Sequence, residues 1–103
     1  MGTYEISVDH RFRARHAIVL SEGEWEESHE HEWLVTATFL SDELTPVTGV
    51  VVDFLDVRDA LKEIGDDLEG RDLNKIDELA EGASAERVAR YLARRLARAL
   101  GPE

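Results

Sequence analysis

Two stretches of the chain alternate apolar and polar side chains with a period of two residues. In residues 3–16 one parity consists of Tyr4, Ile6, Val8, His10, Phe12, Ala14 and His16. In residues 29–40 one parity consists of His29, His31, Trp33, Val35, Ala37 and Phe39. Because successive side chains of a β-strand point to opposite faces, this spacing predicts two half-buried strands. Their short separation along the chain predicts antiparallel pairing.

All four histidines have the parity of the apolar faces of these strands, and three of them can meet at one point. His29 and His31 are two residues apart, and His16 lies at the end of the first strand with the matching parity. Two neighbouring strands can therefore present three imidazoles to one point. Three histidine ligands suit a catalytic zinc, because the fourth coordination position stays open for water or substrate. The alternative is that His29 and His31 bind no metal and form a pair that is solvated or lies at the edge of the core. His10 lies about 20 Å along the strand from His16, and we expect it to be structural.

The segments that follow each strand read as loops or turns. Residues 20–28 carry four glutamates around Trp25, which we expect to be a lid contact or an interface anchor. Residues 42–49 have the composition of a turn. Residues 50–52 are three consecutive valines, which predict a third strand.

Two helices are predicted in the second half of the chain. Asp53 or Asp56 is a candidate N-cap for the first helix, and Ser84 for the last. The apolar positions with helical spacing are Phe54, Val57, Leu61, Ile64 and Leu68 in the first helix, and Val88, Tyr91, Leu92 and Leu96 in the last. Helices that follow an antiparallel sheet cover one of its faces, so we expect an α+β fold.

The composition restricts the class of protein. The 103 residues form a single expected domain, 1–103, with no cysteine for a disulfide, a thiolate ligand or a nucleophile. No stretch resembles a signal peptide or a membrane span, so a cytoplasmic protein with no membrane partner is expected. The 23 acidic against 12 basic residues give a net charge of -11, which argues against a nucleic-acid partner. The acidic excess and scarcity of lysine are typical of halophilic proteins, although a generic acidic surface is the alternative.

An ordered series of short motifs resembles a known family. The series is Phe12-x-Ala14-x-His16, His29-x-His31 with an aromatic two residues later, Gly49-Val-Val-Val-Asp53-Phe54, Leu73-Asn74 and Ser84-Ala85-Glu86. In this order it is similar to the 6-pyruvoyl-tetrahydropterin synthase / 6-carboxy-tetrahydropterin synthase family, from about residue 4 to residue 96. The resemblance implies a tunnelling fold (T-fold) whose subunits form rings, commonly trimers paired into hexamers. It also implies a pterin site between subunits, with Zn²⁺ held by His16, His29 and His31.

The resemblance implies a lyase or synthase that acts on 7,8-dihydroneopterin or its triphosphate, by elimination or cleavage of the side chain. Zinc would act as a Lewis acid on the side-chain oxygens of this substrate. The family's catalytic cysteine is absent, and its Asp-His pair appears as Glu69-Gly70. Glu27 or Glu24 could replace the missing base, or both could belong to a solvated acidic loop. The chain also lacks the family's usual final strand.

Glu86 is the expected substrate-binding residue, because it matches a family glutamate and a carboxylate can accept hydrogen bonds from the amino and imino groups of a pterin. Its alternative role is an acid favoured at a helix N-terminus. Whether the chain is an enzyme therefore stays open. The second hypothesis is a catalytically degenerate T-fold module that binds zinc or a pterin, and the third is a purely structural zinc.

Overall fold

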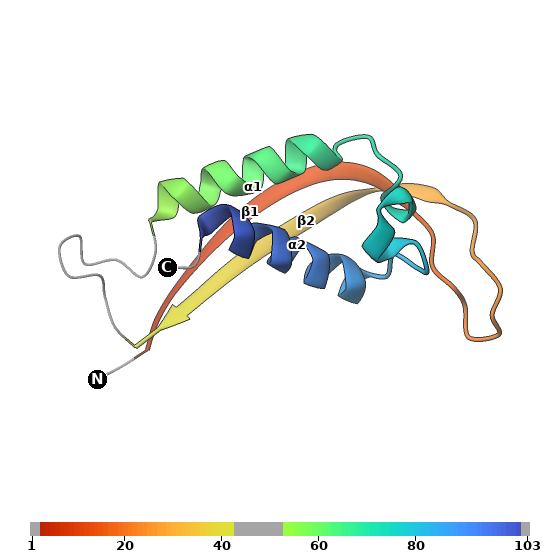
Figure 1. The fold of residues 1–103 in the computed structure, drawn as a ribbon, viewed down its shortest axis with the longest axis horizontal. Helices are drawn as coiled ribbons and strands as arrows, with labels where there is room; N and C mark the ends of the chain where they lie inside the picture. The colour runs from red at the N-terminus through yellow and green to blue at the C-terminus, as the bar shows by residue number, and fades with distance from the viewer. Residues whose placement is uncertain (1–2, 43–52, 102–103) are drawn as a thin grey trace.

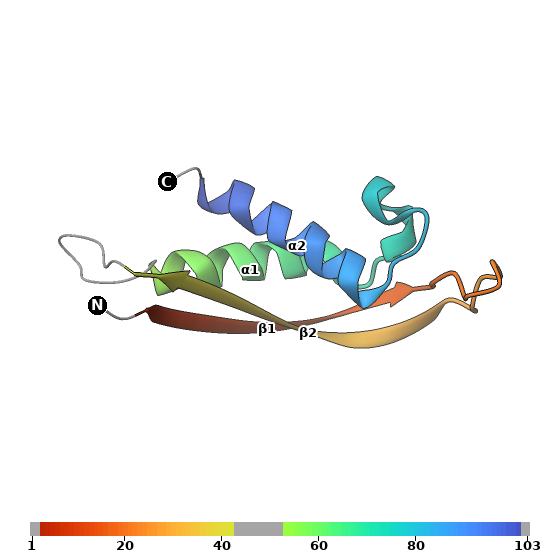
Figure 2. The same cartoon turned by 90° about the horizontal axis from the view of Figure 1, so that it is seen from below.

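The computed structural model describes residues 3–42 and 53–101. Two strands come first, β1 (Tyr4–His16) and β2 (His29–Ser41), and the helices α1 (Phe54–Leu68) and α2 (Ala85–Leu100) follow. The short 3-10 helices η1 (Leu73–Lys75) and η2 (Asp77–Leu79) connect α1 to α2. Both helices lie on the same side of the long curved hairpin (Figures 1 and 2), which confirms the α+β prediction. The third strand predicted at residues 50–52, and the predicted turn from residue 43 onward, lie outside the described residues.

The two strands pair antiparallel over their whole length. The register runs from Tyr4 opposite Ser41 to His16 opposite His29. The apolar parity faces the helices, where Val8, Phe12 and Ala14 are at most 5% exposed. Polar side chains occupy the other face, and pairs such as Arg11 with Glu32 (3.1 Å) link the strands there. The alternation in the sequence thus assigned each face of the hairpin correctly.

Both α-helices begin at a side-chain cap. The carboxylate of Asp53 accepts a hydrogen bond from the Leu55 amide (2.9 Å), so Asp53 rather than Asp56 is the cap of α1. The hydroxyl of Ser84 accepts from the Arg87 amide (3.2 Å) and caps α2 as predicted. The predicted apolar positions are buried except Phe54, which is 44% exposed because the first turn of α1 extends beyond the core.

The segment after α1 returns to the outer edge of β1. The amide of Gly70 donates to the carbonyl of Arg13 (2.7 Å), and the amide of Arg15 donates to the carbonyl of Arg71 (2.8 Å). The Glu69 carboxylate accepts from the Arg13 amide (3.1 Å). Gly70 adopts φ +77°, a left-handed conformation that glycine takes without strain. This part of β1 therefore has hydrogen-bonded neighbours on both sides.

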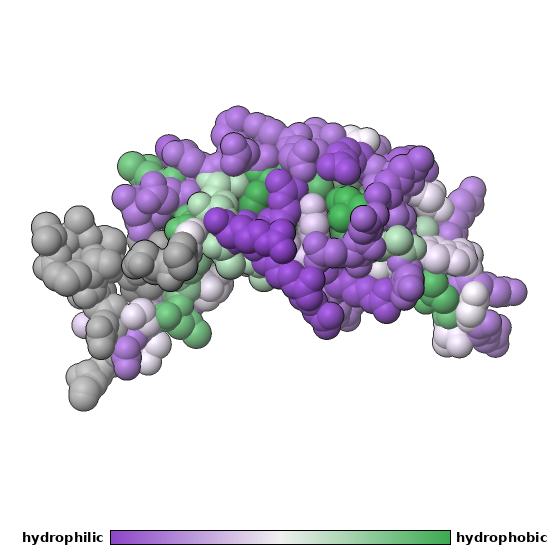
Figure 3. Space-filling model, in the orientation of Figure 1, coloured by the Kyte–Doolittle hydropathy of each residue, from purple (hydrophilic) through white to green (hydrophobic). Residues whose placement is uncertain are grey.

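The core lies between the hairpin and the helices. Leu68, Leu73, Leu79 and Ala83 are essentially inaccessible to solvent and pack beneath the end of the hairpin where β1 finishes. Polar side chains dominate the face seen in Figure 3, and apolar ones show in separate patches, between the two helices and toward both ends of the molecule. In the described ranges, neither helix has both the length and the apolar character needed to cross a bilayer.

Candidate metal centre

The register of the hairpin brings three histidines together on its helix-covered face. His16 lies directly opposite His29, and Ala14 lies opposite His31. His29 and His31 project from the same face because they are two residues apart in one strand. The structure therefore places the side chains as the alternation of the sequence predicts. His16 is buried, His29 is half-buried and His31 is exposed, so the cluster is open to solvent on one side.

The three imidazoles are close enough to share one ion. The distance between ring centroids is 4.8 Å for His16 and His29, 5.0 Å for His16 and His31, and 4.4 Å for His29 and His31. One ligand nitrogen from each ring can be chosen so that all three lie within 4.8 Å of one another. Tetrahedral zinc with bonds of 2.0–2.1 Å separates its ligands by about 3.3 Å. Small rotations of the rings would reach that geometry, so the three histidines could hold a metal ion.

Hydrogen bonds at the Nδ1 atoms, which point away from the centre of the cluster, determine which ring nitrogens are available to a metal ion. The Nδ1 of His16 lies 2.7 Å from the carbonyl oxygen of Ala83, and the Nδ1 of His29 lies 2.9 Å from that of Glu27. A carbonyl oxygen only accepts, so both Nδ1 atoms carry the proton and both Nε2 atoms keep a lone pair. Metal-bound histidines usually make this kind of outer hydrogen bond, which fixes both tautomer and ring orientation.

The Nε2 atoms of the three histidines differ in their hydrogen-bond partners. The Nε2 of His16 is buried and has no hydrogen-bond partner among the described residues. The Nε2 atoms of His29 and His31 lie 2.7 Å apart, so without an ion the Nε2–H of His31 would donate to the lone pair of His29. A buried acceptor without a donor costs about 1–3 kcal/mol. A cation between the three rings would satisfy all three nitrogens, and the residues therefore fit a metal ion.

Comparison with known proteins places the chain in a family. Residues 5–103 match the family described as 6-pyruvoyl tetrahydropterin synthase. The chain belongs to this family. Among solved structures it is similar to 6-pyruvoyl tetrahydropterin synthase from Caenorhabditis elegans, with a TM-score of 0.78 and 17% identity over 99% of this chain and 82% of that chain. That likeness shows the tunnelling fold. No curated protein sequence matches the chain significantly.

Asn74 holds the strand end that carries His16. Its side-chain oxygen accepts a hydrogen bond from the Ala17 amide (2.8 Å), and its side-chain nitrogen donates to the Ala17 carbonyl (3.1 Å). The Ala83 amide donates to the same carbonyl (3.1 Å). Asn74 and Ala83 thus fix the backbone next to His16 from two sides. Sequence reasoning used Leu73-Asn74 only as a mark of the family, because spacing alone does not show what an asparagine contacts.

Trp33 forms a wall beside the cluster. Its ring lies edge-on to His16 at 4.8 Å between centroids, and its indole nitrogen donates to the Ala14 carbonyl (3.3 Å). On the helix-covered face the Trp33 ring also lies 6.2 Å from Phe12 and 6.3 Å from His31 between ring centroids. Sequence reasoning placed Trp33 on this face without a function. The structure shows that it restricts the position of the His16 ring.

The loop glutamates do not join the cluster. Among the described residues, the group that could hold a metal consists of the three histidines and none of the loop acids. Glu26 accepts a hydrogen bond from the Ile18 amide (3.1 Å), which gives it a structural role. Glu24 and Glu27 are exposed, and they take part in the local hydrogen bonds through their carbonyl oxygens. The catalytic role predicted for Glu27 and Glu24 stays a prediction.

Glu86 and His10 lie where the sequence places them. Glu86 is an exposed residue in the first turn of α2, three residues after the Ala83 carbonyl that binds His16. Its predicted contact with substrate stays a prediction. His10 packs against α1, where a Cβ added to Gly65 would lie 2.5 Å from its Nε2. His10 is outside the cluster of three histidines, in agreement with the structural role expected for it.

Proposed function

We propose that the chain is a zinc-dependent enzyme of pterin metabolism. Its expected reaction is the elimination or cleavage of the side chain of 7,8-dihydroneopterin or of its triphosphate. The observation that carries this proposal is the convergence of three imidazoles, of which His16 offers a buried Nε2 with no hydrogen-bond partner in the described part of the chain. Membership of the 6-pyruvoyl tetrahydropterin synthase family supplies the class of substrate.

Three nitrogen ligands and an open side favour zinc in a catalytic role. Imidazole suits Zn²⁺, and three protein ligands leave one coordination position free. When bound, the zinc would polarise oxygens of the substrate side chain and make neighbouring protons easier to remove. The chain's own contribution is orientation: the carbonyls of Ala83 and Glu27 hold the outer nitrogens of His16 and His29. These bonds direct the two Nε2 lone pairs inward before any ion arrives.

Glu27 is the favoured general base. Its main chain is tied to the centre, because its carbonyl accepts the hydrogen bond from His29. Its carboxylate is exposed and could turn toward a bound substrate to accept a proton from the side chain. Glu24 lies earlier in the same loop, where its carbonyl accepts from the Leu20 amide (2.6 Å), and is the second candidate. Both would fill the role of the cysteine that this chain lacks.

Glu86 would bind the pterin ring. Its carboxylate can accept hydrogen bonds from the amino and ring N–H groups of a 2-amino-4-oxo pteridine. Its place in the first turn of α2 joins it to Ala83 and Ser84, so it is attached to the same backbone that orients His16. We further propose that residues 1–103 act as one domain in a cytoplasmic homo-oligomer, such as a trimer or hexamer.

A binding module without catalysis is the second candidate. The chain has no cysteine, and the residues in place of the family's Asp-His pair serve the fold. Glu69 accepts from the Arg13 amide, and Gly70 donates to the Arg13 carbonyl. In these contacts neither Glu69 nor Gly70 presents a proton donor or acceptor to the histidines. In this alternative the chain would bind zinc or a pterin and leave the substrate unchanged.

The two candidates differ in one assay. The zinc-loaded protein is incubated with 7,8-dihydroneopterin and with its triphosphate, and loss of the side chain is followed by chromatography and mass spectrometry. Side-chain loss with the native chain, abolished in Glu27→Gln but kept in the matched control Glu22→Gln, would support the enzyme. Tight binding of either pterin by calorimetry without any product would support the module. A protein that binds neither zinc nor a pterin would contradict both.

A further inference from the structure

The candidate metal centre lies between an acidic loop and the start of α2. The Nδ1 of His16 donates to the carbonyl of Ala83, which precedes the N-cap of α2. The Nδ1 of His29 donates to the carbonyl of Glu27, which belongs to the loop of residues 17–28. The charges of these two segments therefore act at short range on a substrate that binds at the centre.

Carboxylates are numerous in both segments. The loop contains Glu22, Glu24, Glu26 and Glu27, and the first turn of α2 contains Glu86. None of these side chains forms an ion pair with another described residue. A bound Zn²⁺ would add only two positive charges. The surroundings of the centre therefore stay negative when the ion is in place.

Most cations of the chain lie elsewhere. All 12 lysines and arginines belong to the described residues, and none occurs from residue 16 to residue 57. The arginines of β1 have the parity opposite to that of His16, so their side chains lie on the helix-free face of the hairpin; they are Arg11, Arg13 and Arg15. Another group forms ion pairs with acids of the helical half of the chain, and it consists of Arg58, Lys62, Arg71, Arg94 and Arg95.

The remaining cations form no ion pair among the described residues, and two of them are close to the centre in the fold. Arg87 lies over Gly82, where its Nη1 would be 3.6 Å from an added Cβ. Lys75 follows Asn74 in the connection of residues 69–79, where four acids outnumber two bases. The other two, Arg90 and Arg98, lie farther along α2. Even with Zn²⁺ and Arg87, the carboxylates of the loop and of α2 exceed the positive charges beside them.

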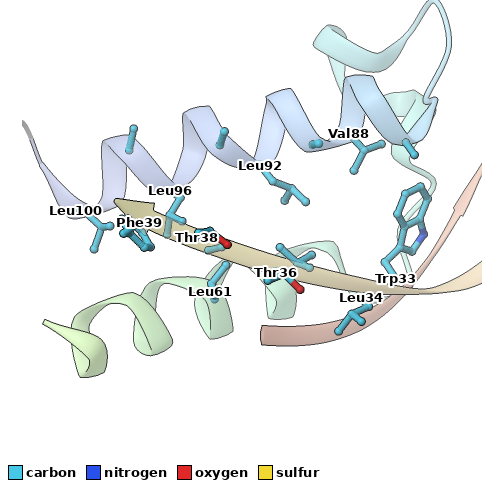
Figure 4. A pocket seen from close by; sticks show the side chains of 16 residues that line it. Trp33, Leu34, Thr36, Thr38, Phe39, Leu61, Val88, Leu92, Leu96 and Leu100 are labelled. Carbon is cyan, nitrogen blue, oxygen red and sulfur yellow. The ribbon is translucent and has the colours of Figure 1, made fainter. Parts of the chain in front are cut away.

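The groove that leads away from the centre offers no cation either. It lies between β2 and α2, has a volume of about 450 Å³, and extends from Trp33 beside the histidines to Phe39 and Leu100 (Figure 4). None of the described residues that line it carries a charge. A group with several negative charges would therefore find no partner on this side of the centre.

We propose that this centre takes unphosphorylated 7,8-dihydroneopterin as its substrate and excludes the triphosphate. The inference rests on the proposed function and chooses between the two substrates named there. A triphosphate ester carries roughly four negative charges near neutral pH. Proteins hold such groups with arginine, lysine or free backbone amides. Here the triphosphate would gain few contacts of this kind and would meet several like charges.

The N-terminus of α2 does not replace the missing cations. Amides at the start of a helix attract phosphate when no other anion is present. The Ser84 hydroxyl accepts a hydrogen bond from the Arg87 amide (3.2 Å), so one of these amides is already used. Glu86 places a carboxylate in the same turn. This end of α2 is therefore a poor site for a phosphate group.

The side chain of dihydroneopterin fits the same surroundings. Its hydroxyl groups are uncharged and can donate hydrogen bonds to carboxylates such as that of Glu27. They need no cation other than the metal ion. It follows that a phosphohydrolase must remove the phosphates by hydrolysis before the pterin reaches this chain.

Affinities for the two pterins test the inference, even if no product forms. The zinc-loaded chain is titrated with 7,8-dihydroneopterin and with its triphosphate by calorimetry, and kcat/KM replaces the affinity where turnover occurs. In about 50 mM KCl we expect dihydroneopterin to be favoured at least about tenfold. In about 2 M KCl the ratio should become smaller without reversing, because salt screens repulsion but supplies no ligand for phosphate.

Charge variants separate the effect of the loop from that of the total charge. Glu22 is exposed in the loop, and Glu63 is exposed on α1. At low salt Glu22→Arg should raise the affinity for the triphosphate at least about threefold and leave that for dihydroneopterin unchanged. Glu63→Arg changes the net charge equally and should have a smaller effect. Equal gains in the two variants would overturn the role given to the loop.

The outcomes distinguish this inference from the proposed function. A triphosphate that binds as tightly as dihydroneopterin at low salt, or more tightly, would overturn the inference and leave the proposed function in place. A chain that binds neither pterin would contradict the proposed function, and the choice between the substrates would be refuted with it.

Discussion

The Nδ1 of His16 donates a hydrogen bond to the carbonyl oxygen of Ala83, 2.7 Å away and 67 residues later in the sequence. This bond joins the end of β1 to the residue before the N-cap of α2. It fixes the tautomer of the imidazole, so that the buried Nε2 keeps its lone pair for an ion. The orientation of the candidate metal centre thus depends on contact between the two halves of the chain.

Replacement of a clustered histidine should remove the metal. We expect about one zinc per chain, and His29→Ala or His31→Ala should lower the zinc content to near zero because two nitrogen ligands hold the ion poorly. His10→Gln is the matched control, since His10 contacts Gly65 and is not in the cluster. The measurement is elemental analysis after dialysis, with circular dichroism to confirm folding. Equal zinc in His29→Ala and in the native chain would exclude the proposed site.

Removal of the Asn74 side chain should weaken both the fold and the metal site. Asn74→Ala leaves the Ala17 amide without an acceptor and removes a donor from the Ala17 carbonyl. We expect a loss of about 2–3 kcal/mol in the free energy of unfolding and a zinc affinity roughly 10–100-fold weaker. Chemical denaturation and competition with a chelator measure the two effects. Asn74→Asp keeps the acceptor and should give an intermediate loss; unchanged zinc affinity in both variants would refute a positioning role for Asn74.

Gly65 should be intolerant of a side chain only while His10 is present. A Cβ at residue 65 would lie 2.5 Å from Nε2 and 2.6 Å from Cδ2 of the His10 ring. We expect Gly65→Ala to destabilise the chain by about 1–2 kcal/mol, because overpacking outweighs the better helix propensity of alanine. In a His10→Ala background the same change should stabilise by about 0.5–1 kcal/mol. A double-mutant cycle by denaturation measures the coupling, and additive effects would contradict the contact.

Salt should raise the melting temperature. The net charge of -11 creates self-repulsion that salt screens. Salt also weakens surface ion pairs such as Lys62 with Asp66, but exposed pairs contribute little to stability. We therefore expect the melting temperature to increase with KCl. Glu63→Gln removes one exposed negative charge and should raise the melting temperature at low salt more than at high salt. A melting temperature independent of KCl would contradict a halophilic adaptation.

The site was predictable in part because it lies on a hairpin. His16, His29 and His31 could be placed on one face from parity and antiparallel pairing, which involve only neighbouring residues. The cap Ser84, the choice of Asp53 or Asp56 as the other cap, and most buried positions of the two helices followed from local patterns as well. Phe54 shows the limit of that reasoning: helical spacing put it on the apolar stripe, yet it is 44% exposed. How far the core extends along a helix is not a local property.

The sequence by itself determined the two strands, the two helices and the parity that directs three imidazoles to the same face, because alternation and capping act over a few residues. Only the tertiary structure decided which histidine nitrogens are held by backbone carbonyls, what lies along the outer edge of β1 and what holds the end of β1. Those features depend on contacts of His16 with Ala83, of Ala17 with Asn74 and of Arg13 with Gly70. Such contacts form when segments more than 50 residues apart pack on a shared core, and no local pattern encodes them.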